Sequence, residues 1–171
     1  RVIAAYNKLF DLDHVDGVLA DDFGVVVAPL LPLVKKQKRF LVAISLPHDR
    51  YCAEAPGYFY SATSQFTQSR PAFEEFFDLH PNIKSIALVI YDDPEWGNSY
   101  REIWNALAAA RGVTVVETYL NNEWYPDFKT PLARIISKHP DAIFVAHEPE
   151  AFMKAIAQLK YQGAVVSANN V

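Results

Sequence analysis

Histidine, cysteine and paired acidic residues are the side chains of this sequence that could perform acid–base or nucleophilic chemistry. His48 and Cys52 lie four positions apart, a spacing at which a cysteine–histidine dyad could be imagined. The stretch around them contains proline and has no helical periodicity, which favours a loop histidine and an incidental thiol. Adjacent acids such as Asp92 and Asp93 point in different directions on a helix or strand and cannot face a common substrate. The sequence therefore gives no positive support for catalysis, and we expect a protein that is not an enzyme.

Metal and cofactor motifs are also missing from the sequence. No two of the five histidines have metal-ligand spacing, and no HExxH, CxxC or calcium-loop pattern occurs. The six glycines are scattered, with no phosphate-binding loop and no GxSxG elbow. His80 and His139 each precede a proline, which is typical of a helix end. We therefore predict no metal and no cofactor.

What remains is a set of polar and aromatic residues that follow short apolar runs. Such continuous runs are typical of strands buried on both faces, and helical patterns separate most of them. This alternation predicts an α/β fold with parallel sheets flanked by helices. Ligands bind beyond the carboxyl ends of the strands in such sheets. The candidate ligand-binding residues at these ends are Ala20, Asp21, Asp22, Pro47, His48, Trp96, His147, Glu148 and Asn169.

Each of these residues also has an ordinary structural explanation. Aspartate and asparagine form turns in most proteins, and Trp96 could pack against its own helix. Their combination at the strand ends of a two-lobed chain favours a small-molecule site, in which an apolar wall and a few directional groups surround the ligand.

The helical patterns predict several helix ends. Gly112 is expected to end the helix of residues 99–111 with a positive φ. A further helix is expected to begin at an N-cap Thr130, and the last helix to run from Pro149 to Gly163.

Length and composition fit two small lobes. The chain has 171 residues, of which 51% are hydrophobic, and a formal net charge of −4. A short aromatic strand at 58–63 is expected to cross from a partial N-terminal lobe, 1–57, to most of a C-terminal lobe, 64–171. The acidic balance and the single basic cluster, KKQKR at residues 35–39, argue against nucleic acid as a partner. No apolar run approaches the roughly 20 residues of a membrane span.

Several stretches together follow one family pattern. They are YNKLFDLDHVDGVLADDF, YFYSATS, SIALVIYDDPEWGNSY and the segment from Asp127-Phe128 through Pro140-Asp141 to Gly163, which is the most specific. With these motifs the chain resembles the type I periplasmic solute-binding proteins of ABC transporters, in particular the branched-chain amino-acid-binding type. The resemblance implies a two-lobed receptor in the periplasm or at the cell surface. Such a receptor closes about a hinge on a small molecule and delivers it to an ABC permease in the membrane.

The resemblance also implies roles for individual residues. In the family, an aromatic residue in the turn before the helix stacks on the ligand, and Trp96 holds that place. Two departures bear on the ligand. Asp21 and Asp22 would repel a carboxylate, and Asn169 stands where amino-acid binders have an acid that holds the ammonium group. The expected ligand therefore ranges from amino-acid-like compounds to amides, cations and aromatic compounds.

Family members are roughly twice as long as this chain, within the usual size of two domains. The resemblance and the absence of an initial methionine therefore predict a segment with an incomplete first lobe. Exposed apolar faces and sheet edges would favour association between copies. Three alternatives remain open: a ligand-sensing domain of a regulator or receptor, an α/β enzyme using the same crevice, and a cell-envelope protein that binds another protein.

Overall fold

The computed structural model describes residues 1–20, 24–44, 50–61, 65–93, 96–122, 127–146 and 149–168. The chain divides into two compact units. Unit 1 comprises Arg1–Gln68 and Pro94–Ser99, and unit 2 comprises Ser69–Asp93 and Tyr100–Val171. The crossover expected at residues 58–63 stays a prediction.

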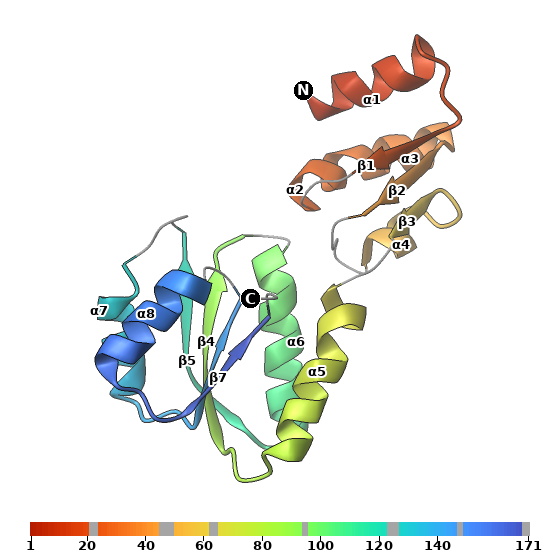
Figure 1. Cartoon of the computed structure of the whole chain (residues 1–171). Coiled ribbons are helices and arrows are strands. Elements are labelled where there is room, and N and C mark those ends of the chain that lie inside the picture. Colours follow the sequence, from red (N-terminus) through yellow and green to blue (C-terminus); the bar gives the residue numbers. More distant parts are fainter. Residues whose placement is uncertain are drawn as a thin grey trace. The chain divides into compact units, whose positions relative to one another are not determined.

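Unit 1 is built on a three-stranded parallel sheet with the strand order β1-β2-β3 (Figure 1). Its strands are β1 (Gly17–Ala20), β2 (Phe40–Ala43) and β3 (Phe59–Ser61). Its helices are α1 (Val2–Asp11), α2 (Gly24–Val27), the 3-10 helix η1 (Ala28–Leu30), α3 (Leu31–Gln37) and α4 (Arg50–Glu54). The short apolar runs of the sequence thus form parallel strands, as expected.

The two faces of the sheet in unit 1 differ. On one face, Leu41 and Phe59 are buried in a core shared with the helices. On the other face, Leu19, Phe40 and Tyr60 are 65%, 49% and 46% exposed. Parallel sheets normally have both faces covered, so this face is an apolar surface able to take further packing.

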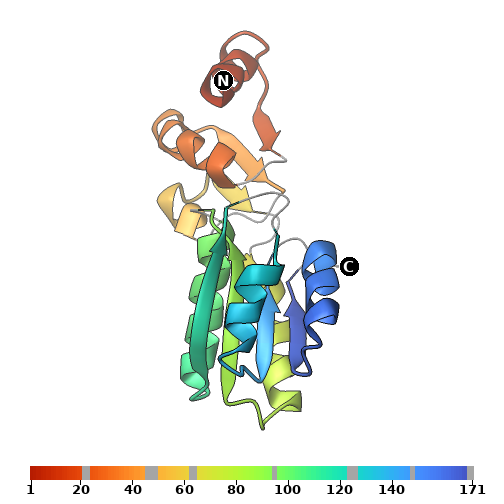
Figure 2. The same ribbon diagram turned by 90° about the vertical axis from the view of Figure 1, so that its left-hand side faces the viewer.

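Unit 2 contains a four-stranded parallel sheet with the order β5-β4-β6-β7. Its strands are β4 (Ser85–Tyr91), β5 (Thr114–Asn121), β6 (Ala142–Val145) and β7 (Ala164–Ser167). The helices are α5 (Gln65–Leu79), α6 (Trp96–Ala110), α7 (Lys129–Ile136) and α8 (Pro149–Leu159). Helices α5 and α6 cover one face of the sheet, and α7 and α8 cover the other (Figures 1 and 2). The α/β class with parallel sheets flanked by helices is thereby confirmed.

A core lies on each face of this sheet, which explains why the central strands are continuously apolar. Toward α5 and α6, the ring of Phe144 lies 5.3 Å from Phe73 and 5.5 Å from Trp104, measured between ring centroids. Toward α7 and α8, Phe128 and Phe152 meet edge to face at 5.7 Å. Burial of these large side chains contributes to the hydrophobic free energy of unit 2, together with the buried aliphatic residues of the strands.

The outer strand β5 has an irregular pairing with β4. The register shifts between Ile86 and Ala87, which leaves Val116 as an extra residue in β5. A bulge of this kind bends the strand and redirects the side chains that follow it. Glu117 consequently pairs opposite Ala87. Its carboxylate forms a 2.7 Å ion pair with Nζ of Lys138, which follows α7. The hydrogen bond from Lys138 lowers the pKa of Glu117.

Two predicted helix ends can be compared with the backbone. Gly112 has a φ of 67° after α6, which confirms its role at that end. The predicted N-cap at Thr130 is wrong, because α7 begins one residue earlier, at Lys129. Asp127 Oδ1 accepts a hydrogen bond from the backbone N of Lys129 at 3.0 Å. A carboxylate ahead of the helix thus satisfies one of its free N–H groups.

The prediction that Gly163 ends α8 is also wrong. Helix α8 ends at Leu159, and Lys160 takes the left-handed conformation with a φ of 53°. Gly163 is needed for another reason, because a Cβ there would overlap the hydroxyl of Tyr161. That hydroxyl donates a 2.7 Å hydrogen bond to the carbonyl of Pro140. Burial is the main cause that raises the pKa of Tyr161 to about 12, so the donor proton is retained.

Asp141 ties the amino ends of β4 and β6 together. Its Oδ2 accepts hydrogen bonds from the backbone N of Lys84 and of Ser85, each at 2.8 Å, and from Ser85 Oγ at 3.0 Å. The hydrogen bond from Lys84, followed by those from Ser85, lowers the pKa of Asp141. This residue of the family-like Pro140-Asp141 motif therefore has a structural role at the amino edge of the sheet.

Replacing Asp141 by asparagine is expected to lower the free energy of unfolding by about 1 kcal/mol at neutral pH, because an amide oxygen accepts more weakly than a carboxylate. The folded pKa lies below the unfolded one. The stabilisation is therefore full above the ordinary aspartate pKa of about 4 and is lost as the pH falls through the folded value. Urea unfolding of both proteins at neutral and acidic pH measures this. A difference that stays constant with pH would contradict the assignment.

Candidate functional site

Within each sheet, parallel pairing brings the carboxyl ends of the strands to one edge. In unit 1, Ala20 pairs with Ala43, and Ala43 pairs with Ser61. In unit 2, Val145 of β6 pairs with Val89 of β4 and with Ser167 of β7. The segments that follow these strands therefore leave each sheet at a common edge, which is where ligands bind in open parallel sheets.

The predicted site residues follow these strand ends in the sequence. Ala20 and Trp96 belong to the described part of the chain, and they are the two whose positions can be given. The remaining candidates lie outside the described residues: Asp21, Asp22, Pro47, His48, His147, Glu148 and Asn169. Their part in a ligand site stays a prediction.

Ala20 is the last residue of β1, and its side chain is half-buried. Trp96 is the first residue of α6, also half-buried, and Gly97 after it is buried. Positions 96, 100 and 104 are four apart and so share one face of the helix. Tyr100 and Trp104 are buried on that face, with ring centroids 5.2 Å apart. The sequence placed Trp96 in the turn before a helix of residues 99–111, whereas α6 already begins at Trp96. Its contact with a ligand stays a prediction.

The turn between β4 and α6 is anchored to the neighbouring strand β5. The backbone N of Asp92 donates a 2.6 Å hydrogen bond to the carbonyl of Asn121. The backbone N of Asp93 then donates to the carbonyl of Tyr91 at 2.8 Å, which bends the chain sharply after the strand. These contacts fix where the chain leaves β4 on its way to α6.

Asn121 is a residue of this edge that the sequence analysis did not predict. In the described part of the chain, buried polar side chains occur at Ser99 and Asn121, and Asn121 is only 1% exposed. It is the last residue of β5 and pairs with Tyr91. The signal that could have identified it is the pair of asparagines directly after an apolar run.

The titratable residues considered for chemistry can be placed only in part, because His48 lies outside the described residues. Within the described ranges, no three or more histidine, cysteine, aspartate or glutamate side chains are placed to hold a metal ion together. Cys52 is exposed on α4. His80 and His139 stand at helix ends as predicted: His80 N donates to Phe76 O at 3.0 Å, and His139 has a φ of 53° after α7. In the same part of the chain, no helix has the length and apolarity to cross a membrane.

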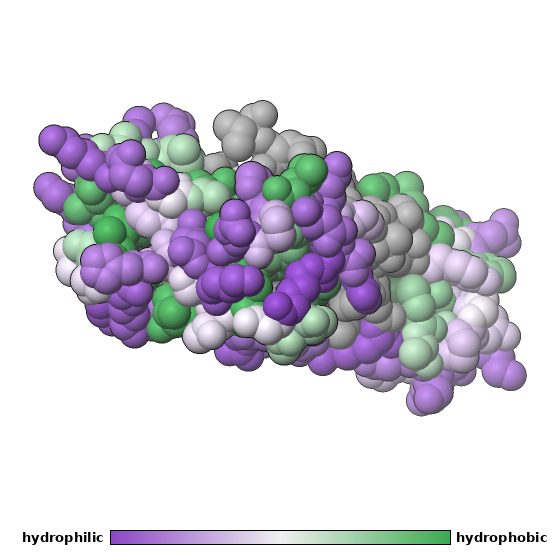
Figure 3. Space-filling view, turned by 90° about the horizontal axis from the view of Figure 1, so that it is seen from below, coloured by the Kyte–Doolittle hydropathy of each residue, from purple (hydrophilic) through white to green (hydrophobic). Residues whose placement is uncertain are grey.

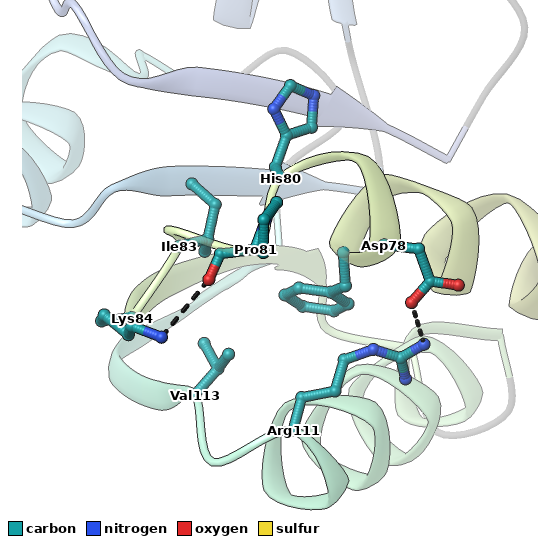
Figure 4. A pocket seen from close by; sticks show the side chains of 8 residues that line it. Asp78, His80, Pro81, Ile83, Lys84, Arg111 and Val113 are labelled. Atoms are coloured by element: carbon teal, nitrogen blue, oxygen red, sulfur yellow. Dashed lines mark hydrogen bonds and ion pairs between the residues drawn. The ribbon is translucent and has the colours of Figure 1, made fainter.

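A pocket of about 370 Å³ lies in unit 2, at the opposite edge of the sheet from the predicted site. Lys84, which precedes β4, and Arg111, which follows α6, extend into it from different sides (Figure 4). Arg111 contacts Asp78 Oδ1 at 3.1 Å, and Lys84 donates to the carbonyl of Pro81 at 3.3 Å. Both cations are thus engaged by groups of the pocket wall itself. Figure 3 shows hydrophilic residues over much of the surface seen from below.

The family model described as periplasmic binding protein matches residues 1–168. No curated protein matches the chain significantly.

Several solved structures share the fold. An extracellular ligand-binding receptor from Rhodopseudomonas palustris HaA2 matches with a TM-score of 0.79 and 18% identity over 97% of this chain. A solute-binding protein of an ABC transporter from Rhodopseudomonas palustris BisB5, in complex with 3,4-dihydroxybenzoic acid, matches with a TM-score of 0.77 and 22% identity over 97% of this chain. A branched-chain amino acid ABC transporter protein from Thermus thermophilus with bound valine matches with a TM-score of 0.83 and 15% identity over 96% of this chain. The match covers 47%, 47% and 44% of those chains, so this chain spans about half their length.

Proposed function

Because the chain belongs to the periplasmic binding protein family, we propose that it is part of an extracytoplasmic receptor that binds a small molecule and delivers it to an ABC permease. The observation that carries the proposal is the family match over residues 1–168. The parallel sheets support it, because each gathers its strand ends at one edge. The receptor is placed in the periplasm or at the cell surface, where permeases of this kind receive their solutes.

The ligand is proposed to be an aromatic, amide-like or amino-acid-like compound. Two of the similar structures hold 3,4-dihydroxybenzoic acid and valine. Trp96 at the start of α6 offers a flat apolar surface on which a ring or a planar amide can stack. Asp21 and Asp22 follow β1 and favour a ligand without a carboxylate at that side.

The mechanism is proposed to be closure of two lobes about a hinge. The division of the chain into two compact units supports this, because a hinge needs units that hold together separately. A ligand that contacts both lobes stabilises the closed state by its differential affinity for that state, and no covalent step is required. In a chain with an incomplete first lobe, the exposed face of Leu19, Phe40 and Tyr60 would also promote association between copies.

A melting screen with the full-length receptor tests the ligand proposal. We expect one of four classes, namely aromatic acids, amides, amino acids or polyamines, to raise the melting temperature by a few degrees. A ligand at one hundred times its Kd stabilises the folded state by about 2.7 kcal/mol. A compound that binds should lose this effect in a Trp96→Ala variant, whereas compounds acting through the solvent should not. Absence of a shift in all four classes would contradict the solute-receptor proposal and favour a protein-binding role.

A further inference from the structure

The pocket of about 370 Å³ in unit 2 has an apolar floor. Phe77 and Val113, which line it, are only 4% and 9% exposed. Pro81 and Ile83 complete the apolar part of the lining. The volume lies in the lower part of the range of about 300–1,000 Å³ that is typical of small-molecule sites. A pocket of this size and lining can hold a small compound with an apolar body.

The two walls of this pocket are hydrogen-bonded to each other. The backbone N of Thr114 donates to the carbonyl of Lys84 at 2.8 Å, which joins the start of β5 to the segment before β4. The backbone N of Lys84 donates in turn to Asp141 Oδ2 at 2.8 Å. In the same segment, the backbone N of Ile83 donates to the carbonyl of His80 at 3.1 Å. The backbone from which Lys84 extends is thus held on both sides, so a ligand has little of this wall to order.

Two cations extend into the pocket with hydrogen-bond donors to spare. Among the described residues, the acceptors of Arg111 are Asp78 Oδ1 at 3.1 Å and the carbonyl of Glu74 at 3.4 Å, and its Nη2 reaches both. Its Nε and Nη1 have no acceptor in that part of the chain. Lys84 Nζ has three donors and makes one long contact there, 3.3 Å to a backbone carbonyl. The two cations enter from different sides, and His80 points away from both (Figure 4).

The lining of this pocket has a net positive charge, although the formal net charge of the chain is −4. Lys84 and Arg111 share the lining with one acid, Asp78. The side chain of Asp78 is 71% exposed, so its ion pair with Arg111 is largely in water and contributes little. The carboxylate of Asp141 is bound to backbone N–H groups and lies outside the lining. An incoming carboxylate therefore meets two cations and has only a weak internal competitor.

We propose that this pocket is a second small-molecule site, which binds a small organic carboxylate with an apolar body. The carboxylate lies between Arg111 and Lys84, where a planar guanidinium can donate two parallel hydrogen bonds and the ammonium adds a second charge. The apolar body lies on Phe77 and Val113. An inorganic anion would leave this floor uncovered, and a neutral amide would lose the charge-assisted hydrogen bonds. The site is separate from the one proposed at the carboxyl ends of the strands and does not depend on it.

Titration of the full-length receptor with benzoate tests the proposal, with two isoleucine methyl signals in a ¹³C–¹H spectrum as the readout. Ile83 lines the pocket just before β4, and Ile90 is buried near the other end of that strand. Ile83→Val and Ile90→Val variants identify the two signals. We expect benzoate to shift the Ile83 signal to saturation. Benzamide and inorganic phosphate should need concentrations at least about tenfold higher, because each lacks one half of the recognition.

Substitutions of the two cations separate this site from any other. We expect Lys84→Gln and Arg111→Gln each to weaken the Ile83 response to benzoate by at least about tenfold. Lys154→Gln is the matched control, because it removes the same charge from an exposed lysine that pairs with Glu150 on α8, and it should leave the response unchanged. If Arg111→Gln does not fold, as a displaced Ile90 signal without benzoate would show, Arg111→Met is judged by the same rule.

Four outcomes would overturn the proposal. They are an Ile83 signal that never shifts to saturation, a response that survives both cation variants, an equal loss in Lys154→Gln, and benzamide or phosphate binding as tightly as benzoate. A shift of the Ile90 signal alone would place benzoate at the carboxyl edge of the sheet and count against the pocket as well. Trp96 takes no part in this readout, so its failure is distinguishable from a failure of the melting screen.

Discussion

Replacing Phe144 by alanine is expected to lower the free energy of unfolding of unit 2 by about 3–5 kcal/mol. The side chain is completely buried in β6, at the centre of an aromatic cluster. Its ring lies within 5.6 Å of the rings of Phe73, Phe76, Phe77 and Trp104. Truncation removes the transfer free energy of the ring and leaves a cavity that these four neighbours cannot all close.

The matched control for this change is Phe40→Ala. Phe40 is also on a parallel strand, but its side chain is 49% exposed. We expect that substitution to cost less than about 1 kcal/mol, because exposed sites tolerate truncation. Denaturant unfolding monitored by near-ultraviolet circular dichroism measures both effects. Equal losses for the two variants would show that Phe144 is not at the centre of a packed core.

Replacing Trp96 by alanine is expected to weaken ligand binding by about tenfold or more in the full-length receptor, which corresponds to about 1.4 kcal/mol. An aromatic side chain stacked on a ligand supplies a large contact area at small entropic cost, so its loss is felt mainly in affinity. Trp96 is only half-buried, unlike Trp104 on the same helix face, so its truncation removes less packing. The melting temperature of the ligand-free protein should therefore change much less than the affinity.

Isothermal titration with the compound identified by the melting screen measures the affinity of each variant. Trp96→Phe serves as the conservative variant and should retain most of the affinity, because it keeps an aromatic ring. If Trp96→Ala binds as tightly as the wild-type protein, Trp96 has no place in the ligand site and only packs against its own helix.

The fold could be predicted from the sequence because its strands are buried on both faces. Such strands appear as continuous apolar runs, and SIALVIY and DAIFVAH became β4 and β6 within one or two residues. The family resemblance drawn from the motifs is likewise confirmed by the family model. The helix ends were less predictable. Asp127 and Thr130 are both residue types that cap helices. The helix begins at Lys129, and it is Asp127 that accepts a hydrogen bond from the first helical N–H group.

Contacts between distant segments explain what the sequence could not reveal. Gly163 was predicted to end a helix, but a side chain there would instead overlap the Tyr161 hydroxyl. That hydroxyl donates to the carbonyl of Pro140, a residue distant in the sequence that precedes β6, the strand paired with β7. Asn121 follows an apolar run, and nothing in the sequence indicated that it is buried at the end of β5, opposite Tyr91. Most of the candidate ligand residues fall outside the described part of the chain, so their convergence remains a prediction.

The extra residue in β5 has a consequence for the behaviour of the chain while it is being synthesised. An outer strand presents a row of N–H and C=O groups that can recruit a strand from another molecule and begin aggregation. The bulge at Val116 interrupts that row near its beginning and twists the strand. A foreign strand could then match only part of β5. We therefore expect the same irregularity that brings Glu117 to Lys138 to limit the pairing of β5 with strands of other molecules.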